Sequence, residues 1–147
     1  MIPVEQEFRF NAATGERGDC LRACMASLLE LPREEVPHFV GMGDAWYSEW
    51  MRWLHERGWA IGGFEIPPPD EGGAGPSTWR QGYWLACVYS PRFTDADGLR
   101  GLHMVVMSAD ELVWDPHPER ADSHEGFVHG YYLVPLDPAR FEFKAAA

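Results

Sequence analysis

The sequence lacks the long apolar run that a membrane span requires. None of its hydrophobic stretches approaches the roughly 20 uninterrupted apolar residues that cross a bilayer as a helix. The beginning of the chain, Met1–Glu7, is acidic and has neither the basic nor the apolar region of a secretory signal peptide. We therefore expect a cytoplasmic protein that does not act on a membrane.

Positive charge is also scarce. The chain carries 12 Lys and Arg residues against 23 Asp and Glu residues, which gives a net charge of −11. Binding to nucleic acid or to an anionic lipid surface needs clustered basic side chains, so neither is expected as the main partner. The acidic balance itself is typical of a surface that keeps a protein in solution.

Cysteine is represented three times, which is too few for a disulfide framework. The count is odd, and Cys20 and Cys24 lie four residues apart in one predicted helix. Secreted disulfide-rich domains carry more cysteines in even numbers, so we expect reduced thiols. Nothing in the sequence indicates a cofactor.

The length and composition predict a single globular domain over residues 1–147, since 46% of the residues are hydrophobic and 14% aromatic. The apolar spacing is helical in the first half of the chain and strand-like in the second. These patterns predict an α+β fold, with N-terminal helices packed on an antiparallel β-sheet. A loop rich in Pro and Gly is expected over 67–76. We expect a first helix after an Asp19 N-cap, a short helical turn over Arg33–Val36, and a further helix from an Asp44 cap to Arg57. The expected strands are Trp59–Glu65, Tyr83–Tyr89, His103–Met107, Leu112–Asp115 and Tyr131–Leu136.

Cys20 lies directly after Gly18 and Asp19, at the predicted start of the first helix. A thiol at this position faces unsatisfied backbone N–H groups and the positive end of the helix dipole. Both stabilise a thiolate and lower a pKa that is ordinarily about 8.5. The residues alone leave two interpretations open, an activated nucleophile or a small buried hydrophobic residue. Cys24, one turn further along the apolar stripe, is predicted to be core.

His103 and Asp115 lie near the open ends of a predicted β-hairpin. A three-residue turn over Ser108–Asp110 would set them directly opposite each other, with Cβ atoms about 4.5–5.5 Å apart. A carboxylate at that distance fixes the tautomer of an imidazole. A two-residue turn would instead pair Asp115 with Met104 and place the acid on the other face of the sheet.

The same region offers a second chemistry. His103, Asp115 and His117 are the ligand types of a metal site built from two histidines and one carboxylate. Pro116 and Pro118 indicate that the strand has ended before His117, which disfavours a shared geometry. We therefore expect no metal, and we expect His117 at the rim of the site or in solvent.

Several blocks of the chain together resemble small papain-like cysteine peptidase-fold proteins of bacteria and phages, a group similar to the C39-type peptidase superfamily. The blocks occur in the same order and cover most of the chain. They are Gly18-Asp19-Cys20-Leu21-Arg22-Ala23-Cys24-Met25-Ala26-Ser27-Leu28-Leu29, Leu31-Pro32, Val36-Pro37-His38-Phe39, Ser90-Pro91-Arg92, His103-Met104-Val105-Val106 and Asp115-Pro116-His117-Pro118.

The resemblance implies a catalytic triad of Cys20, His103 and Asp115, and a glutamine upstream of the cysteine that donates to the oxyanion. Gln6 is the upstream candidate, 14 residues before Cys20 and further away than is usual in the family. The turn-like segment from Asn11 to Gly18 would accommodate the extra residues, and Asn11 is the second choice. Residues 93–101 look inserted and are expected to form either part of a substrate cleft or a longer surface loop.

Residues and resemblance together predict a cysteine-dependent hydrolase of amide bonds, either a peptidase or an isopeptidase or amidase. Its partner would be a protein, a peptide or another amide-containing substrate. Side-chain deamidation and acyl transfer use the same machinery. The alternative from another class is a non-catalytic binding or inhibitor protein that retains the papain-like fold.

Overall fold

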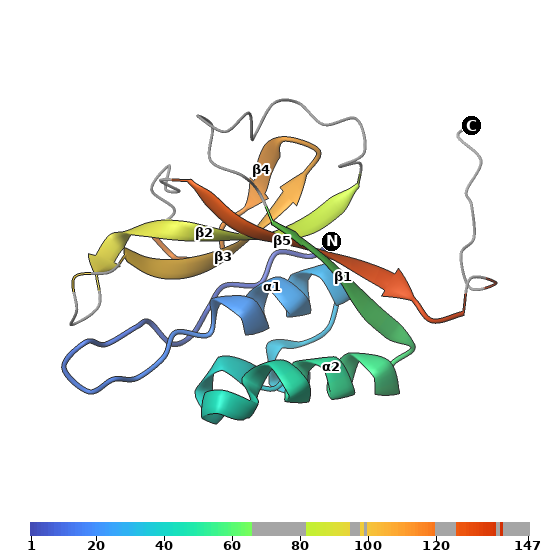
Figure 1. Ribbon diagram of the computed structural model, residues 1–147, viewed down its shortest axis with the longest axis horizontal. Helices are drawn as coiled ribbons and strands as arrows, with labels where there is room; N and C mark the ends of the chain where they lie inside the picture. The colour runs from blue at the N-terminus through green and yellow to red at the C-terminus, as the bar shows by residue number, and fades with distance from the viewer. Residues whose placement is uncertain (66–81, 95–97, 99, 120–125, 138, 140–147) are drawn as a thin grey trace.

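The computed structural model describes residues 1–65, 82–94, 98, 100–119, 126–137 and 139. Helical elements come first along the chain and strands follow (Figure 1). The helical elements are α1 (Cys20–Leu29), the 3-10 turns η1 (Arg33–Glu35) and η2 (Phe39–Ala45), and α2 (Trp46–Glu56); the strands are β1 (Trp59–Glu65), β2 (Tyr83–Thr94), β3 (Arg100–Ser108), β4 (Glu111–Trp114) and β5 (Phe127–Pro135).

The five strands form one antiparallel sheet in the order β1-β5-β2-β3-β4. The predicted α+β class is confirmed. The predicted loop at 93–101 is wrong at both of its ends, because β2 continues to Thr94, β3 begins at Arg100, and these two residues pair; residues 95–97 and 99 lie outside the described residues. The predicted loop at 67–76 lies outside the described residues.

The first helix starts where the sequence predicts, with Asp19 at the N-cap position, although the Asp19 side chain makes no capping hydrogen bond. The predicted Asp44 cap of α2 is wrong. Residues 39–45 form a 3-10 segment interrupted at Gly43, whose φ of 64° no helix can continue, and α2 begins only at Trp46. Gly58, with φ of 81°, ends this helix as predicted.

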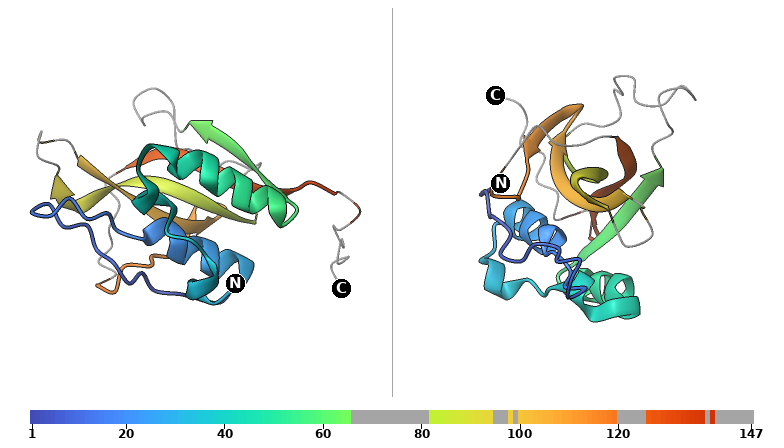
Figure 2. Two further views of the ribbon diagram at one scale, coloured as in Figure 1. Left: turned by 90° about the horizontal axis from the view of Figure 1, so that it is seen from below. Right: turned by 90° about the vertical axis from the view of Figure 1, so that its left-hand side faces the viewer.

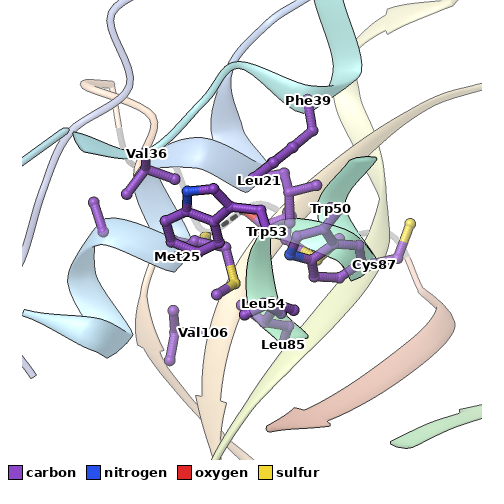
Figure 3. Close-up of a cluster of buried hydrophobic side chains, with 13 residues drawn as sticks. Leu21, Met25, Val36, Phe39, Trp50, Trp53, Leu54, Leu85, Cys87 and Val106 are labelled. Atoms are coloured by element: carbon purple, nitrogen blue, oxygen red, sulfur yellow. Dashed lines mark hydrogen bonds between the residues drawn. The ribbon is translucent and has the colours of Figure 1, made fainter. Parts of the chain in front are cut away.

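The main hydrophobic core lies between the two helices and one face of the sheet (Figure 3). Trp50 and Leu54 of α2 are fully buried there, and Trp53 nearly so. On α1 the apolar stripe faces the same core, as its spacing predicts. This packing fixes α1, and hence Cys20, relative to β2 and β3.

A second cluster fills the opposite face of the sheet, around Trp84 and Val105. The sheet curls strongly in the end-on view (Figure 2, right), as expected for a twisted antiparallel sheet. Gly130 is required here, since a Cβ at this position would overlap the ring of Phe64. Because both faces are packed, β3 is buried over most of its length.

Within the described ranges, no helix is long and apolar enough to cross a bilayer.

Candidate active site

The turn between β3 and β4 is shorter than predicted. Ser108 pairs with Glu111, so the turn consists of Ala109–Asp110 and the predicted three-residue turn is wrong. Ala109 takes a positive φ of 49°, a conformation that tight hairpin turns use. By itself, this two-residue turn would place Asp115 on the face of the sheet opposite to His103.

A bulge in the hairpin returns Asp115 to the face of His103. Beyond the turn the register shifts by one residue, and Val106 pairs with Trp114. Continuing that register would set Asp115 opposite Val105, which shares its face of β3 with His103. The extra residue therefore cancels the change of face that the short turn imposes. The two predicted partners meet, although by a different route.

The carboxylate of Asp115 is held by three donors. Its Oδ1 lies 2.7 Å from Nε2 of His103 and accepts the backbone N–H of His117 at 2.9 Å. Its Oδ2 accepts a hydrogen bond from the Arg92 guanidinium at 3.1 Å. His103 and Asp115 are both buried. Because Nε2 of His103 faces the carboxylate, Nδ1 is the ring nitrogen that can exchange a proton with a nucleophile.

Cys20 reaches this pair along the outer edge of β3. Strand β4 covers that edge only at Val106–Ser108. Met104, two residues before Val106, does not pair with β4, and its backbone bonds to α1. Its carbonyl accepts a hydrogen bond from the Cys24 thiol at 3.4 Å, and its N–H donates to the sulfur of Cys20. The early end of β4 thus leaves room for the start of α1 beside His103.

Cys20 and His103 perturb each other in the directions that favour an ion pair. Burial alone would raise the pKa of the Cys20 thiol, but the His103 ring and the N–H groups of Met104 and Leu21 together lower it. Burial alone would lower the pKa of His103, but the Cys20 thiolate and the Asp115 carboxylate outweigh it and raise this pKa to about 9. At neutral pH the arrangement favours a thiolate beside an imidazolium.

Asp115 remains ionised in this environment. Burial opposes its ionisation, but the hydrogen bonds and charge of His103, the His117 N–H and the Arg92 guanidinium hold the pKa of its carboxyl well below the usual range. The carboxylate therefore orients the His103 ring and stabilises its charged form.

The other two cysteines have the opposite environment. Burial raises the pKa of the Cys24 thiol well above its ordinary value, and it raises the pKa of Cys87 to about 12. Cys20 is partly exposed, whereas Cys24 and Cys87 are buried, and all three are free thiols. The prediction that Cys24 is core is confirmed.

Gln6 is buried beside the Asp115 loop, because its backbone N–H donates to the carbonyl of Pro116 at 3.0 Å. Its side-chain Nε2 donates to the carbonyl of Phe8 at 2.9 Å. Asn11 lies in an exposed turn, and its side-chain oxygen accepts the N–H of Ala13. Of the two predicted oxyanion donors, only Gln6 is placed between α1 and the Asp115 loop.

His117 lies in a loop beside the site, which agrees with the predicted position at the rim, but its side chain is buried, so the alternative of a solvent-exposed His117 is wrong. Its ring packs edge-on to His103, with 6.3 Å between ring centroids, and its Nδ1 accepts the N–H of Glu119. Burial and the nearby positive charges lower its pKa, Arg92 first among them. In the part of the chain that the structure describes, no three His, Cys, Asp or Glu side chains converge as metal ligands.

Sequence reasoning missed two groups that contact Asp115, namely the Arg92 guanidinium and the backbone N–H of His117. Arg92 is separated by 23 residues from Asp115, so sequence gives no distance between them.

Compared with known proteins, the chain matches no family model, no curated protein and no solved structure.

Proposed function

We propose that this protein is a papain-like cysteine hydrolase of amide bonds, with Cys20 as nucleophile, His103 as general acid and base, and Asp115 as the residue that orients His103. The substrate class is a protein, a peptide or another amide-containing molecule, and the location is cytoplasmic. The three free thiols support a reducing compartment.

One observation carries this proposal. A thiol at the start of a helix interacts with an imidazole whose far nitrogen lies 2.7 Å from a buried carboxylate. The three residues come from α1, β3 and the segment after β4, so no local structural need brings them together. Nucleophile, base and orienting acid in this order are the components of covalent acyl-transfer catalysis.

In the acylation step, the Cys20 thiolate attacks the amide carbonyl carbon and forms a C–S bond. The carbonyl electrons move onto oxygen to give a tetrahedral oxyanion. His103 then gives its Nδ1 proton to the leaving nitrogen as the C–N bond breaks, which releases an amine and leaves a thioester on Cys20. The Asp115 carboxylate stabilises the imidazolium that exists before this proton transfer.

In the deacylation step, the neutral His103 removes a proton from water, and the resulting oxygen nucleophile attacks the thioester carbon. The C–S bond breaks, a carboxylic acid leaves, and the thiolate and imidazolium are restored. An amine in place of water would give acyl transfer, and a side-chain amide substrate would give deamidation.

The oxyanion of both steps needs N–H donors. The backbone N–H of Cys20 at the start of α1 is one candidate, and the side-chain amide of Gln6 is the other. An amide NH₂ carries two N–H groups, and the contact with the Phe8 carbonyl uses one of them.

Turnover of p-nitrophenyl acetate tests the proposal without knowledge of the natural substrate. The wild-type protein should release nitrophenol in a burst, carry an acetyl group on Cys20 by peptide mass spectrometry, and then turn over as water hydrolyses the thioester. Cys20→Ala should lose the burst and the acetylated peptide. Cys24→Ala is the matched control, because this thiol is buried on the same helix, and it should retain both.

The alternative, a binding or inhibitor protein with the same fold, makes a different prediction. Such a protein could carry a reactive Cys20 that becomes acetylated once, but it would not release the acetyl group faster than a free thioester hydrolyses. No acetylation of Cys20, or acetylation with no turnover in wild type, would overturn the hydrolase proposal. Profiling a proteome-derived peptide library for new N-termini or deamidated side chains that depend on Cys20 would then define the amide cleaved.

A further inference from the structure

The N-terminal segment 4–9, which we call the strap, connects the two sides of the candidate site. On the Asp115 side, its Gln6 N–H donates to Pro116 O, and Arg9 forms an ion pair with Glu119 at 3.0 Å. The indole N–H of Trp114 donates to the strap carbonyl of Val4 at 3.1 Å. The strap thus carries Gln6 between the Cys20 helix and the Asp115 loop.

On the Cys20 side, the strap is held by Asp19, whose side chain is fully buried. Its Oδ1 accepts the backbone N–H groups of Glu7 at 2.9 Å and of Phe8 at 2.8 Å. Its own backbone N–H donates to Phe8 O at 3.2 Å. The same Phe8 carbonyl accepts the side-chain amide of Gln6, so one strap residue connects Asp19 to the oxyanion donor.

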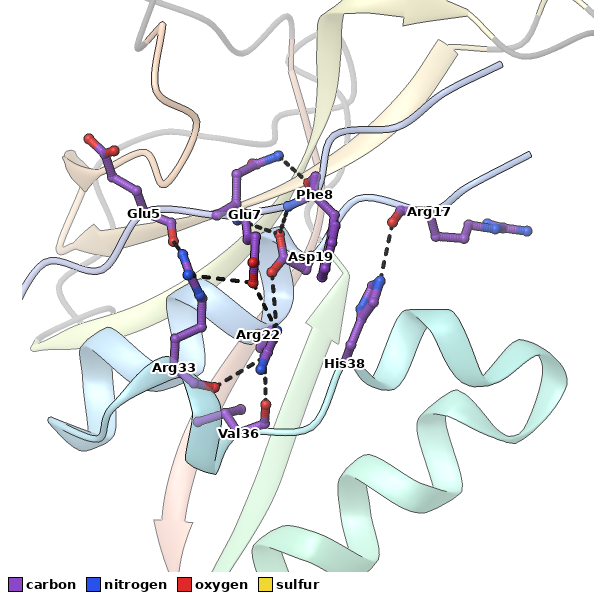
Figure 4. A network of polar contacts seen from close by, with 10 residues as sticks. Glu5, Glu7, Phe8, Arg17, Asp19, Arg22, Arg33, Val36 and His38 are labelled. Carbon is purple, nitrogen blue, oxygen red and sulfur yellow. Dashed lines mark hydrogen bonds and ion pairs between the residues drawn. The ribbon is translucent and has the colours of Figure 1, made fainter. Parts of the chain in front are cut away.

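The surrounding polar residues compensate the buried charge of Asp19 (Figure 4). The Arg22 guanidinium lies 3.7 Å from Asp19 Oδ2 and 3.7 Å from a carboxylate oxygen of Glu7. Arg22 is itself fixed by the carbonyls of Arg33 and Val36. A buried carboxylate that accepts backbone N–H groups and faces a fixed cation is a rigid anchor.

The close approach of the strap to Gly18 completes this arrangement. A Cβ at Gly18 would lie 3.3 Å from Phe10 N and from Phe8 O, which is tighter than ordinary contact. Gly18 and Asp19 therefore form one docking surface for the strap, directly before the nucleophile in the chain. This placement explains why the Asp19 carboxylate makes no capping hydrogen bond to the backbone of α1.

We propose that Asp19 is a positioning residue for the oxyanion donor, which holds the Gln6 amide in register with Cys20 through the strap. The proposal rests on the proposed hydrolase function. Asp19 touches neither the substrate nor the reacting atoms. Its effect should therefore appear only in steps that develop an oxyanion, and not in the ionisation of the Cys20 thiol.

Two reactions of the same thiol separate these effects. Acetylation by p-nitrophenyl acetate passes through a tetrahedral oxyanion, whereas alkylation by iodoacetamide is a direct displacement at carbon without one. We expect Gln6→Ala to reduce the acetylation rate of Cys20 by about 100-fold, the scale for loss of one oxyanion donor. Asp19→Ala should reduce it at least ten-fold. Both variants should keep the alkylation rate and its pH profile.

Conservative and control variants keep the proposal falsifiable. Asp19→Asn retains an oxygen that accepts both strap N–H groups, so it should keep most of the wild-type acetylation rate. If Asp19→Ala does not fold, Asp19→Asn is the variant that tests the proposal. Ser27→Ala is the matched control, because the buried Ser27 hydroxyl accepts the strap N–H of Val4 at 2.9 Å, away from Gln6. This variant should leave the ratio of acetylation to alkylation unchanged.

The double variant Gln6→Ala/Asp19→Ala decides whether the two residues act together. If Asp19 acts through Gln6, the double variant should be no slower in acetylation than Gln6→Ala alone. Additive losses, an equal fall in acetylation and alkylation, or no loss in Asp19→Ala would overturn the positioning role. Absence of Cys20 acetylation in the wild-type protein would instead contradict the hydrolase function itself.

Discussion

Replacement of Asp115 by Asn tests the electrostatic arrangement of the site with the smallest change of shape. The carboxylate accepts hydrogen bonds from His103, His117 and Arg92. An amide at this position can still accept from the His117 N–H, but its NH₂ group must face either His103 or the Arg92 guanidinium, which are both donors. The charged partner of the imidazolium is lost in either orientation.

The magnitude follows from the His103–Asp115 contact. A hydrogen bond to a charged group contributes roughly 1.5–3 kcal/mol, which corresponds to about one to two pH units in the pKa of His103. The His103 pKa of about 9 should therefore fall to about 7–8, since the Cys20 thiolate still raises it. The same energy predicts a loss of about 10-fold to 150-fold in turnover of an acetyl ester.

Two measurements check this prediction. The pKa of His103 is read from an NMR titration of its ring protons in wild type and in Asp115→Asn, and turnover is measured with p-nitrophenyl acetate. An unchanged His103 pKa together with turnover within about three-fold of wild type would show that the carboxylate does not stabilise the imidazolium in solution.

Three further predictions concern pH and stability. Hydrolysis of an amide needs a protonated His103 to release the amine, so its rate should decline as the pH rises through about 9, and a rate still increasing above that pH would contradict this acid role. Ser27→Ala removes the acceptor of Val4 N–H and should lower the free energy of unfolding by about 1–2 kcal/mol in urea denaturation; an unchanged midpoint would count against this anchor. Trp50→Ala in the fully buried core should lower the free energy of unfolding by about 3–5 kcal/mol, measured by thermal and denaturant unfolding. A loss below about 1 kcal/mol would show that the core around Trp50 rearranges to fill the space.

Much of the fold could be predicted because local patterns determine it. The apolar residues of α1 recur at helical spacing, and β1 and β2 are rich in the aromatic residues that are typical of strands. The start of α2 was predicted too early, because Asp44 has the chemistry of a cap while the backbone at Gly43 is incompatible with a continuous helix. Cap chemistry alone does not reveal such a backbone break.

The meeting of His103 and Asp115 shows where sequence reasoning reaches its limit. The length of the turn determines which residues of the second strand share a face with those of the first. A bulge shifts this pairing by one residue, and no residue type in β4 indicates that a bulge is present. The predicted turn is one residue too long and the predicted register lacks the bulge, and these two errors have opposite effects on the face of Asp115. The predicted three-residue turn therefore brought the right two residues together for the wrong reason.

Asp19 illustrates the same limit on the other side of the site. An Asp before a helix predicts a cap, because side-chain oxygens at that position commonly accept the first N–H groups of the helix. Its carboxylate instead accepts the N–H groups of Glu7 and Phe8. Such a contact depends on the path of a segment that has no periodic pattern of its own, so only the tertiary structure reveals it.

The pH dependence of alkylation at the three cysteines tests the central claim, an activated thiol at Cys20, most directly. Each thiol is followed by peptide mass spectrometry after iodoacetamide treatment, from about pH 5 to about pH 10. We expect the alkylation rate at Cys20 to reach its plateau below the ordinary thiol pKa of about 8.5 and to exceed the rates at Cys24 and Cys87 by at least about 100-fold at neutral pH. Equally slow labelling of all three cysteines, with a rate at Cys20 that still rises above this pH, would show that Cys20 is not activated.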